Sequence, residues 1–367
     1  MFRILRNFSN TIDLLKVGDH CNVIIYCQNS SYFTFFQKLI NLLSKRNLKI
    51  VFLTSEHKWM PKNLPENVRF YDIGEGFIRN YVFENLRGGI FVSTTPDLGL
   101  YQLKRSEAVK YYIYLQHSLV SLHSAYNAGA FDSFDEVFCA GPHHVQELEA
   151  IVSKSNLQKI RSFKHGYSRA DILLEEGRKF AGSKNQKRKI LIAPSWGEYD
   201  FITANINKFI EFTRAFDCDL IIRPHPQSVR QDPSGYRKLK EMIEDNSSIT
   251  LDVDRNSVES VLSSDILVTD WSGITFDFYL VKKRPVIFIE THQKIRNKNF
   301  KQYHLPAIEE EIRFRLGHVV TERVFFETDI GISACTKEYD LENLVYNLGS
   351  SDQAACSRIL QLNEYCG

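Results

Sequence analysis

The chain has 367 residues, of which 43% are hydrophobic and 25% are charged, and its formal net charge at pH 7 is +2. A chain of this length and composition is expected to form about two globular domains that fold without disulfides or metal. The small net charge argues against a nucleic-acid-binding protein, which would carry a clear basic excess.

The cysteines and the N-terminus indicate the compartment. Seven cysteines are scattered and form no C-x-x-C pair, which argues against a disulfide framework or zinc site and favours a reducing compartment. No stretch approaches the ~20 apolar residues that cross a bilayer, and the N-terminus is too polar for a secretory signal. It predicts a short amphipathic helix with Phe2, Leu5, Phe8 and Ile12 on one side. A packed first helix and a membrane-surface anchor both fit that pattern.

Short apolar runs alternate with helical patterns in the first half of the chain. Apolar strands separated by helices indicate a parallel sheet that is buried on both faces. The sequence therefore predicts a Rossmann-like acceptor domain over residues 1–172. Its strands are predicted at 22–26, 49–53, 68–73, 89–92, 111–115 and 136–140, and its helices at 32–45, at 77–86 and from about 142.

The same alternation restarts after a basic, glycine-containing stretch at 176–189, which is predicted to be a linker or a surface loop. A second Rossmann-like domain is predicted over 173–340, with a C-terminal helix over 341–367 that packs back on the first domain. Two such domains facing each other place a cleft at the carboxyl ends of their strands, where ligands bind. The second set of strands is predicted at 190–193, 220–223, 249–253, 266–269 and 286–289, with helices at 205–216, 236–245, 257–263 and 274–281.

The clearest chemical motif joins a strand to a helix. The strand ends at Thr269 and Asp270, and Ser272 and Gly273 begin the helix. Ser272 suits the N-cap, and Gly273 allows a ligand to approach the backbone closely. The N–H groups and dipole of such a helix bind phosphate without metal, and the hydroxyls of Ser272 and Thr269 can add to them. An ordinary capped helix is the alternative.

Histidines follow two other strands. Prolines on both sides fix the backbone around His225, Arg223 suits bidentate phosphate binding, and His225 can donate to an anionic oxygen. His117 follows the strand 111–115 and suits a general base that removes a proton from an attacking hydroxyl. Rigid-turn and structural roles are the alternatives. His123 is a second candidate, whereas His143 and His144 are predicted to be surface or capping residues.

Two weaker patterns complete the set, and several common motifs are absent. The segment 166–171 carries Arg169 and Asp171 near the domain crossover, and the segment 193–196 brings Ser195 to a strand end. The chain has no Walker motif, G-x-G-x-x-G, G-x-S-x-G or H-E-x-x-H. This argues against ATPases, dinucleotide dehydrogenases, α/β-hydrolases and zinc peptidases.

Taken in order, five segments resemble the CDP-glycerol glycerophosphotransferase family of teichoic acid and capsule enzymes. The similarity covers roughly residues 110–290. The family pattern has proline where Ser168 stands, tyrosine where Trp271 stands and serine where Gly273 stands, so the donor identity stays open. The segments are QHS at 116–118, GYSRAD at 166–171, APSW at 193–196, RPHP at 223–226 and TDWSGITFD at 269–277.

The resemblance implies a GT-B fold and transfer of a polyol phosphate from a CDP-activated donor to a hydroxyl of a cell-surface glycan or lipid-linked acceptor, with release of CMP. It implies work in the bacterial cytoplasm, at the inner face of the membrane. No cofactor or metal is expected, because fixed cationic groups and backbone donors can do the work of a metal. His117 corresponds to the general base and His225 to the group that stabilises the donor phosphates. The expected donor and phosphate contacts are Ser195, Arg223, Thr269, Asp270, Ser272 and Gly273, with Asp277, Arg169, Asp171 and His123 in support.

Three alternatives remain at this stage, and one of them is a sugar epimerase of the non-hydrolysing type. A GT-B glycosyltransferase that uses a nucleotide sugar shares the fold but releases a different nucleotide, such as UDP. A non-catalytic nucleotide-binding subunit of a capsule assembly complex binds the ligand but forms no product.

Overall fold

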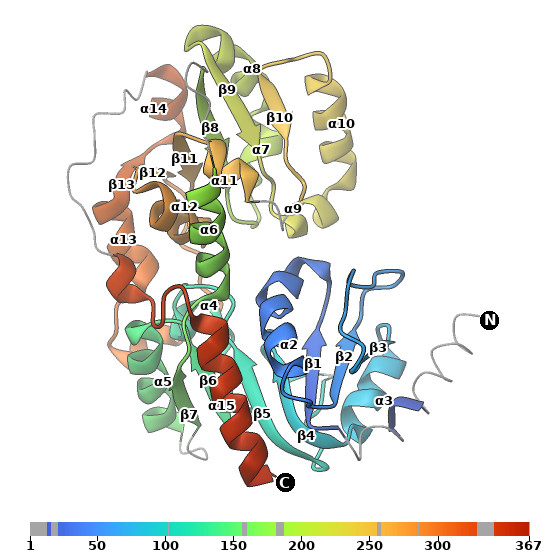
Figure 1. Cartoon of the computed structure of the whole chain (residues 1–367). Coiled ribbons are helices and arrows are strands. Elements are labelled where there is room, and N and C mark those ends of the chain that lie inside the picture. The colour runs from blue at the N-terminus through green and yellow to red at the C-terminus, as the bar shows by residue number, and fades with distance from the viewer. Residues whose placement is uncertain are drawn as a thin grey trace. The chain divides into compact units, whose positions relative to one another are not determined.

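The computed structural model describes residues 13–15, 21–101, 103–155, 160–180, 187–254, 258–284, 286–328 and 341–366. The chain divides into two compact units, each with its own parallel sheet (Figure 1). Unit 1 comprises Met1–Asp171, Arg296–Leu305 and Asn343–Gly367, and unit 2 comprises Ile172–Ile295 and Pro306–Glu342. The amphipathic N-terminal helix predicted around Phe2, Leu5, Phe8 and Ile12 lies outside the described residues.

Seven parallel strands form the sheet of unit 1, in the order β3-β2-β1-β4-β5-β6-β7. The chain starts in the middle, adds two strands on one side and then crosses to the other side, so β1 and β4 mark the switch point. Each predicted strand of this half is present, with ends that differ by one or two residues. The strands are β1 (Val23–Cys27), β2 (Ile50–Thr54), β3 (Val68–Asp72), β4 (Gly88–Ser93), β5 (Val109–Leu115), β6 (Glu136–Cys139) and β7 (Arg161–Lys164).

Helices cover both faces of this sheet. The predicted helix over 32–45 is divided into η1 and α2, because the side chain of Asn29 caps η1 and a second helix starts after Phe36. The C-terminal helix α15 packs against α2 and β4. The helices are η1 (Ser30–Phe35), α2 (Gln37–Ser44), α3 (Phe77–Asn85), α4 (Leu122–Ala125), α5 (Pro142–Ser155), η2 (Phe300–Tyr303), η3 (Leu341–Leu344) and α15 (Ser351–Cys366).

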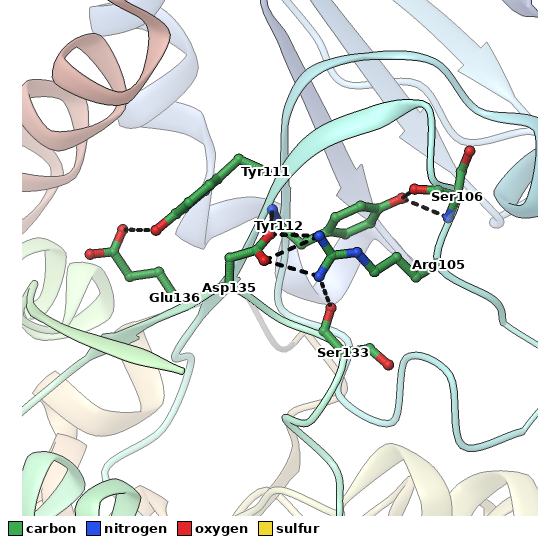
Figure 2. Close-up of polar contacts among 7 residues, drawn as sticks. All are labelled: Arg105, Ser106, Tyr111, Tyr112, Ser133, Asp135 and Glu136. Atoms are coloured by element: carbon green, nitrogen blue, oxygen red, sulfur yellow. Dashed lines mark hydrogen bonds and ion pairs between the residues drawn. The ribbon is translucent and has the colours of Figure 1, made fainter. Parts of the chain in front are cut away.

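A polar cluster fastens the amino ends of β5 and β6, as Figure 2 shows. Asp135 accepts a hydrogen bond from the backbone N–H of Tyr112 at 2.7 Å, and it forms an ion pair with Arg105 at 3.0 Å. The Tyr112 hydroxyl accepts from the N–H of Ser106 at 2.9 Å and donates to its carbonyl at 3.2 Å. These contacts fix one end of β5, the strand whose other end carries His117.

Six parallel strands form the sheet of unit 2, in the order β10-β9-β8-β11-β12-β13, so the switch point lies between β8 and β11. The edge strand β13 was not predicted, because its Gly-His-Val-Val run is short and only half-buried. Position 317 requires glycine because β13 lies so close to β12 that a Cβ atom would collide with the Val286 carbonyl oxygen. The strands are β8 (Arg188–Ile192), β9 (Cys218–Ile222), β10 (Ile249–Leu251), β11 (Ile266–Thr269), β12 (Val286–Ile289) and β13 (Gly317–Val320).

The linker prediction is partly wrong, because the first residues of 176–189 belong to a helix. α6 (Ser168–Lys179) runs on through Gly177, where an added Cβ would lie 3.1 Å from Val281 and 3.5 Å from Leu262. Residues 181–186 lie outside the described chain. The remaining helices are α7 (Phe201–Ala204), α8 (Ile206–Ala215), α9 (Pro226–Gln231), α10 (Pro233–Ile243), α11 (Glu259–Ser263), α12 (Ile274–Lys282), α13 (Ile308–Leu316) and α14 (Glu322–Glu327).

The segment Arg296–Leu305, which the predicted second domain 173–340 includes, belongs to unit 1 in the structure. Its η2 helix packs on α4 and α5. The N–H groups of Arg296 and Asn297 donate to the carbonyl of Ser124, and the Asn297 side chain donates to that of His123 at 3.0 Å. These contacts lie far apart in sequence, which is why the alternation of strands and helices did not reveal them.

Two further predictions concern cysteines and membrane spans. Cys21, Cys27, Cys139, Cys218 and Cys356, the cysteines whose side chains the structure describes, are all free and buried. Within the described ranges, no helix combines the length and apolarity needed to span a bilayer.

Candidate active site

Ser195 and Asp270 join the two strands at the switch point of unit 2. The backbone N–H of Ser195 donates to one Asp270 carboxylate oxygen at 2.7 Å, and its hydroxyl donates to the other at 2.8 Å. Thr269, one residue earlier, donates its buried hydroxyl to the carbonyl of Ala193 at 2.8 Å. The three predicted donor contacts therefore hold the loops after β8 and β11 to each other.

The start of α12 lies directly after this pair. The cap residue is Gly273 rather than the predicted Ser272, whose hydroxyl accepts only a long contact of 3.5 Å from Ile274. Gly273 has φ −62°, which any residue adopts, so its conformation does not require glycine. Among the described residues, the N–H groups of Ser272 and Gly273 make no hydrogen bond. Anionic oxygens bind well at such a helix start.

His225 lies at the carboxyl end of β9 and caps α9. Its Nδ1 accepts a hydrogen bond from the N–H of Gln227 at 3.1 Å. In the neutral ring the hydrogen is therefore on Nε2, which makes that nitrogen a donor. This tautomer suits the predicted contact of His225 with an anionic oxygen.

Trp196 links His225 to a cation that sequence reasoning missed. The Trp196 and His225 rings lie 6.2 Å apart. Lys294 places its Nζ 3.6 Å from the Trp196 ring centroid and donates to the Trp196 carbonyl at 2.7 Å. No motif surrounds Lys294 in the sequence, which lies 98 residues away from Trp196.

Arg223 is turned toward the protein in this structure. Its guanidinium donates to Ser260 at 2.7 Å and to the carbonyl of Asp254 at 3.1 Å, and it lies 3.6 Å from the Asp252 carboxylate. The guanidinium that was predicted to bind phosphate is thus bonded to α11 and to the segment after β10. Arg223 can hold the strand end that carries His225.

Two buried side chains lie near the start of α12. Asp277 is buried in its first turn. Arg313 of α13, also missed in the sequence, lies 3.9 Å from the Trp271 ring centroid and donates to the carbonyl of Ile289 at 3.1 Å. Trp271, one residue before Ser272, is therefore packed on a buried cation.

His117 lies at the carboxyl end of β5 in unit 1, inside a ring of aromatic side chains. Its Nδ1 is 3.2 Å from the Tyr114 hydroxyl. The rings of Tyr32, Phe35 and Tyr126 lie edge-on, with centroids 5.2, 6.0 and 6.4 Å away. These contacts restrict the rotation of a half-buried imidazole.

The loop after His117 is held by α5, and the prediction that His143 and His144 are surface or capping residues is wrong in placing His144 at the surface, since it is fully buried. His144 is fully buried and His143 is half-buried, and burial lowers the pKa of both. Their Nε2 atoms donate to the carbonyls of Leu119 and Val120, each at 2.9 Å. They are neutral side chains that satisfy the backbone of the loop.

His123 has a structural position in unit 1. Its side chain is fully buried; Nδ1 lies 3.2 Å from Glu147 and Nε2 donates to the carbonyl of Leu305 at 3.2 Å. Since the Leu305 carbonyl ends the segment Arg296–Leu305, His123 fastens this segment to unit 1.

The segment 166–171 receives the N-terminus of α15. Asp171 accepts hydrogen bonds from the N–H groups of Gly349 at 2.6 Å and Ser351 at 2.8 Å. Gly166 has φ +113°, and a Cβ there would collide with Ser351 Oγ. Arg169 is buried on α6. Asp171 therefore serves as an anchor for α15, a role that its spacing in the sequence did not indicate.

Known structures share this architecture. UDP-GlcNAc 2-epimerase from Methanocaldococcus jannaschii, in complex with UDP-GlcNAc and UDP, is 12% identical, with a TM-score of 0.56 over 92% of this chain and 98% of that chain. The Rickettsia bellii UDP-N-acetylglucosamine 2-epimerase is 12% identical, with a TM-score of 0.56 over 94% and 97%. The Neisseria meningitidis enzyme bound to UDP-GlcNAc is 10% identical, with a TM-score of 0.54 over 92% and 99%. At these identities the likeness concerns the fold, and the predicted α/β GT-B fold with two Rossmann-like units is confirmed.

Comparison at the level of families is more specific. None of the curated proteins compared with the chain matches its sequence. Residues 132–305 match the family model of CDP-Glycerol:Poly(glycerophosphate) glycerophosphotransferase. This range contains Ser195, His225 and the start of α12, whereas His117 precedes it. The resemblance to the CDP-glycerol glycerophosphotransferase family that the motifs indicated is therefore confirmed over residues 132–305.

Proposed function

We propose that the chain transfers a polyol phosphate, such as glycerol phosphate, from a CDP-activated donor to a hydroxyl of a cell-surface glycan or lipid-linked acceptor. The family match identifies a transferase. The observation that carries the proposal further is the set of donors in unit 2: the N–H groups of Ser272 and Gly273, His225 Nε2 and the Lys294 ammonium. A diphosphate donor needs such a set, because its charge moves onto the leaving CMP during transfer.

The proposed reaction is a direct displacement. His117 takes the proton of the acceptor hydroxyl, whose oxygen attacks the phosphorus next to the transferred polyol. The bond from that phosphorus to the bridging oxygen breaks, and CMP leaves with the bonding electrons. His225, Lys294 and the start of α12 stabilise its charge, and Arg223 holds the strand end behind His225. The proposal requires no divalent metal. We assign the reaction to the bacterial cytoplasm, at the inner face of the membrane where lipid-linked acceptors lie.

A nucleotide-release assay tests the proposal. CDP-glycerol, CDP-ribitol and UDP-sugars are offered with a lipid-linked or oligosaccharide acceptor, with and without EDTA. We expect CMP from a CDP-linked donor in both conditions, and a loss of about 100-fold or more in His117→Ala and His225→Ala. His318→Ala is the matched control, because His318 is exposed on β13.

The other outcomes separate the alternatives. UDP release from a UDP-sugar would make the protein a glycosyltransferase, and conversion of the UDP-sugar without release would make it an epimerase. Nucleotide binding without any product would support the non-catalytic subunit.

A further inference from the structure

A group of polar side chains in unit 1 lies where β4 leaves the sheet, at the switch point between β1 and β4. β4 pairs with β5, and Ser93 lies opposite Tyr114. Because neighbouring strands lie about 4.8 Å apart, Thr94 and Thr95 leave the sheet beside the segment that carries His117. Ligands of parallel sheets bind at the carboxyl ends of the strands next to such a switch point. The residues after Ser93 are therefore placed to meet a ligand that reaches His117.

Three atoms of this group are buried without a hydrogen-bond partner. Among the described residues, nothing bonds to the hydroxyls of Thr94 and Thr95 or to Oδ1 of Asp97. Thr94 is 2% exposed, whereas Thr95 and Asp97 are half-buried, so the group extends from the interior of unit 1 to its surface. Buried polar atoms of folded proteins nearly always have partners. Three exceptions in one short segment indicate that a ligand supplies the partners.

Other hydrogen bonds fix the backbone around these atoms. The N–H of Thr95 donates to the Ser93 hydroxyl at 2.9 Å. The N–H of Asp97 donates to the carbonyl of Ala130 at 2.9 Å, and its Oδ2 accepts from the Asn127 side chain at 3.0 Å. Asp97 has φ +66°, a conformation that Asp and Asn adopt more readily than most other side chains. The segment is thus held in place by bonds that leave the three atoms unused.

The three atoms define the chemistry of the ligand. A threonine hydroxyl both donates and accepts, whereas a carboxylate oxygen only accepts. A ligand with neighbouring hydroxyl groups satisfies all three atoms, because each of its hydroxyls also donates and accepts. A phosphate would instead be repelled by the negative charge of Asp97. The set therefore favours a neutral polyol or sugar over the anionic part of a nucleotide donor.

We propose that Thr94, Thr95 and Asp97 form an acceptor subsite in unit 1, which binds neighbouring hydroxyls of a neutral polyol or sugar. The inference rests on the proposed transferase function and names the side chains that select the acceptor. Asp97 accepts a hydrogen bond from one acceptor hydroxyl, and the two threonine hydroxyls bind the next one. These bonds hold the end of the acceptor beside His117, where a further hydroxyl can lose its proton.

The stability of unit 1 tests the missing partner without any ligand, by hydrogen exchange of β1 peptides in the full chain. Thr94→Val keeps the shape of the side chain and removes a hydroxyl that bonds nothing in the protein, so exchange should be unchanged or slower. Thr54→Val is the matched control at the carboxyl end of β2. The buried Thr54 hydroxyl accepts from the N–H of Glu56 at 3.2 Å, so its loss should speed exchange about tenfold. Equal acceleration in both variants would show that Thr94 is already bonded and would overturn the inference.

Saturation-transfer nuclear magnetic resonance of the full chain tests the class of ligand, with ribitol and methyl α-glucoside as neutral probes. We expect transfer to at least one probe, and the probe that responds distinguishes a polyol from a sugar. The signal should fall at least threefold in Thr94→Val and in Asp97→Asn, which keeps the backbone conformation but turns an accepting oxygen into a donor. Thr54→Val should keep the signal. CMP binding should be the same in all variants, because the nucleotide contacts lie in unit 2.

The transfer assay gives the last readout. Thr94→Val and Asp97→Asn should raise the KM for the acceptor about tenfold and leave the KM for the donor unchanged. An unchanged acceptor KM in a protein that transfers, no signal from either neutral probe, or equal signals in the wild type and both variants would overturn the subsite. Probe binding that is lost in both variants of a protein that transfers nothing would uphold the subsite while the proposed function fails.

Discussion

At the scale of single residues, several polar side chains of the candidate site form hydrogen bonds within the protein. Ser195 donates two hydrogen bonds to the Asp270 carboxylate, and the Thr269 hydroxyl donates to the carbonyl of Ala193. The two ring nitrogens of His225 have different roles: Nδ1 accepts a hydrogen bond from the backbone N–H of Gln227, so in the neutral ring Nε2 is a donor. The Arg223 guanidinium is bonded to Ser260, whereas the Lys294 ammonium donates to the carbonyl of Trp196 in the loop after β8.

Lys294 is therefore expected to contribute to nucleotide binding. Lys294→Met removes the charge beside Trp196 but keeps the length of the side chain, and it should weaken CMP binding about tenfold, which corresponds to about 1.4 kcal/mol. Titration calorimetry at low salt measures the effect, because salt screens such charges. Lys240→Met on the exposed side of α10 serves as the control. Equal affinities in the two variants would remove Lys294 from the site.

The sequence identified residues by their place at strand ends but not by their partners. His117, His225 and Ser272 follow apolar strands, which is visible from the pattern alone. The contacts of Lys294 with Trp196 and of Arg313 with Trp271 join distant segments, and no local signal marks them. The contact of Tyr114 with His117 was not predicted for another reason, since a tyrosine in an apolar strand is normally a core residue.

At the scale of elements, apolar runs predicted central strands and missed half-buried ones. β8, β9 and β11 contain the apolar runs 190–192, 220–222 and 266–268, whereas β7 carries Arg161 and Lys164 and has no fully buried residue. The start of α6 was missed because Gly166 and Ser168 are residue types that are common in loops. In the structure Gly166 lies close to Ser351, and the Ser168 hydroxyl donates to Asp352, both at the start of α15. Docking between elements is a tertiary property that periodicity does not encode.

The N-terminus of α15 carries a carboxyl that is expected to make stability depend on pH. Burial raises the pKa of Asp352 from 3.8 to about 7, and its Oδ2 has no hydrogen-bond partner among the described residues. Because the folded state keeps a proton that the unfolded chain releases, rising pH favours unfolding between pH 4 and 7, and the penalty is constant above 7. Asp352→Asn removes this penalty. Its stability advantage should grow by about 2–3 kcal/mol from pH 5 to pH 8.

Asp171 is the contrasting residue in the same contact. Asp171→Asn weakens the hydrogen bonds with the N–H groups of Gly349 and Ser351 and should destabilise unit 1 by about 1–3 kcal/mol at pH 8. Urea unfolding followed by Trp59, in a Trp196→Phe/Trp271→Phe background, measures both variants within unit 1. An advantage of Asp352→Asn that is the same at pH 5 and pH 8 would show that Asp352 is ionised in the folded protein.

At the scale of the whole molecule, the chain passes between two units that have separate cores. One core surrounds β1, β4 and β5, and the other surrounds β8, β9 and β11. The chain crosses at 171, 295, 305 and 342, so neither unit is a single continuous segment. A ligand held by one unit can stabilise that unit more than the other, because local stability differs between cooperative regions.

Hydrogen exchange with CMP tests whether the nucleotide contacts are confined to unit 2. Binding at 100 times the Kd stabilises the bound unit by about 2.7 kcal/mol, which slows exchange through its unfolding about 100-fold. We expect this slowing in peptides from β8, β9 and β11, and a much smaller effect in peptides from β1, β4 and β5. In Lys294→Met the same protection should require more CMP. Equal slowing in both sets of strands would mean that unit 1 contributes equally to nucleotide binding, and the assignment of the nucleotide site to unit 2 would then be wrong.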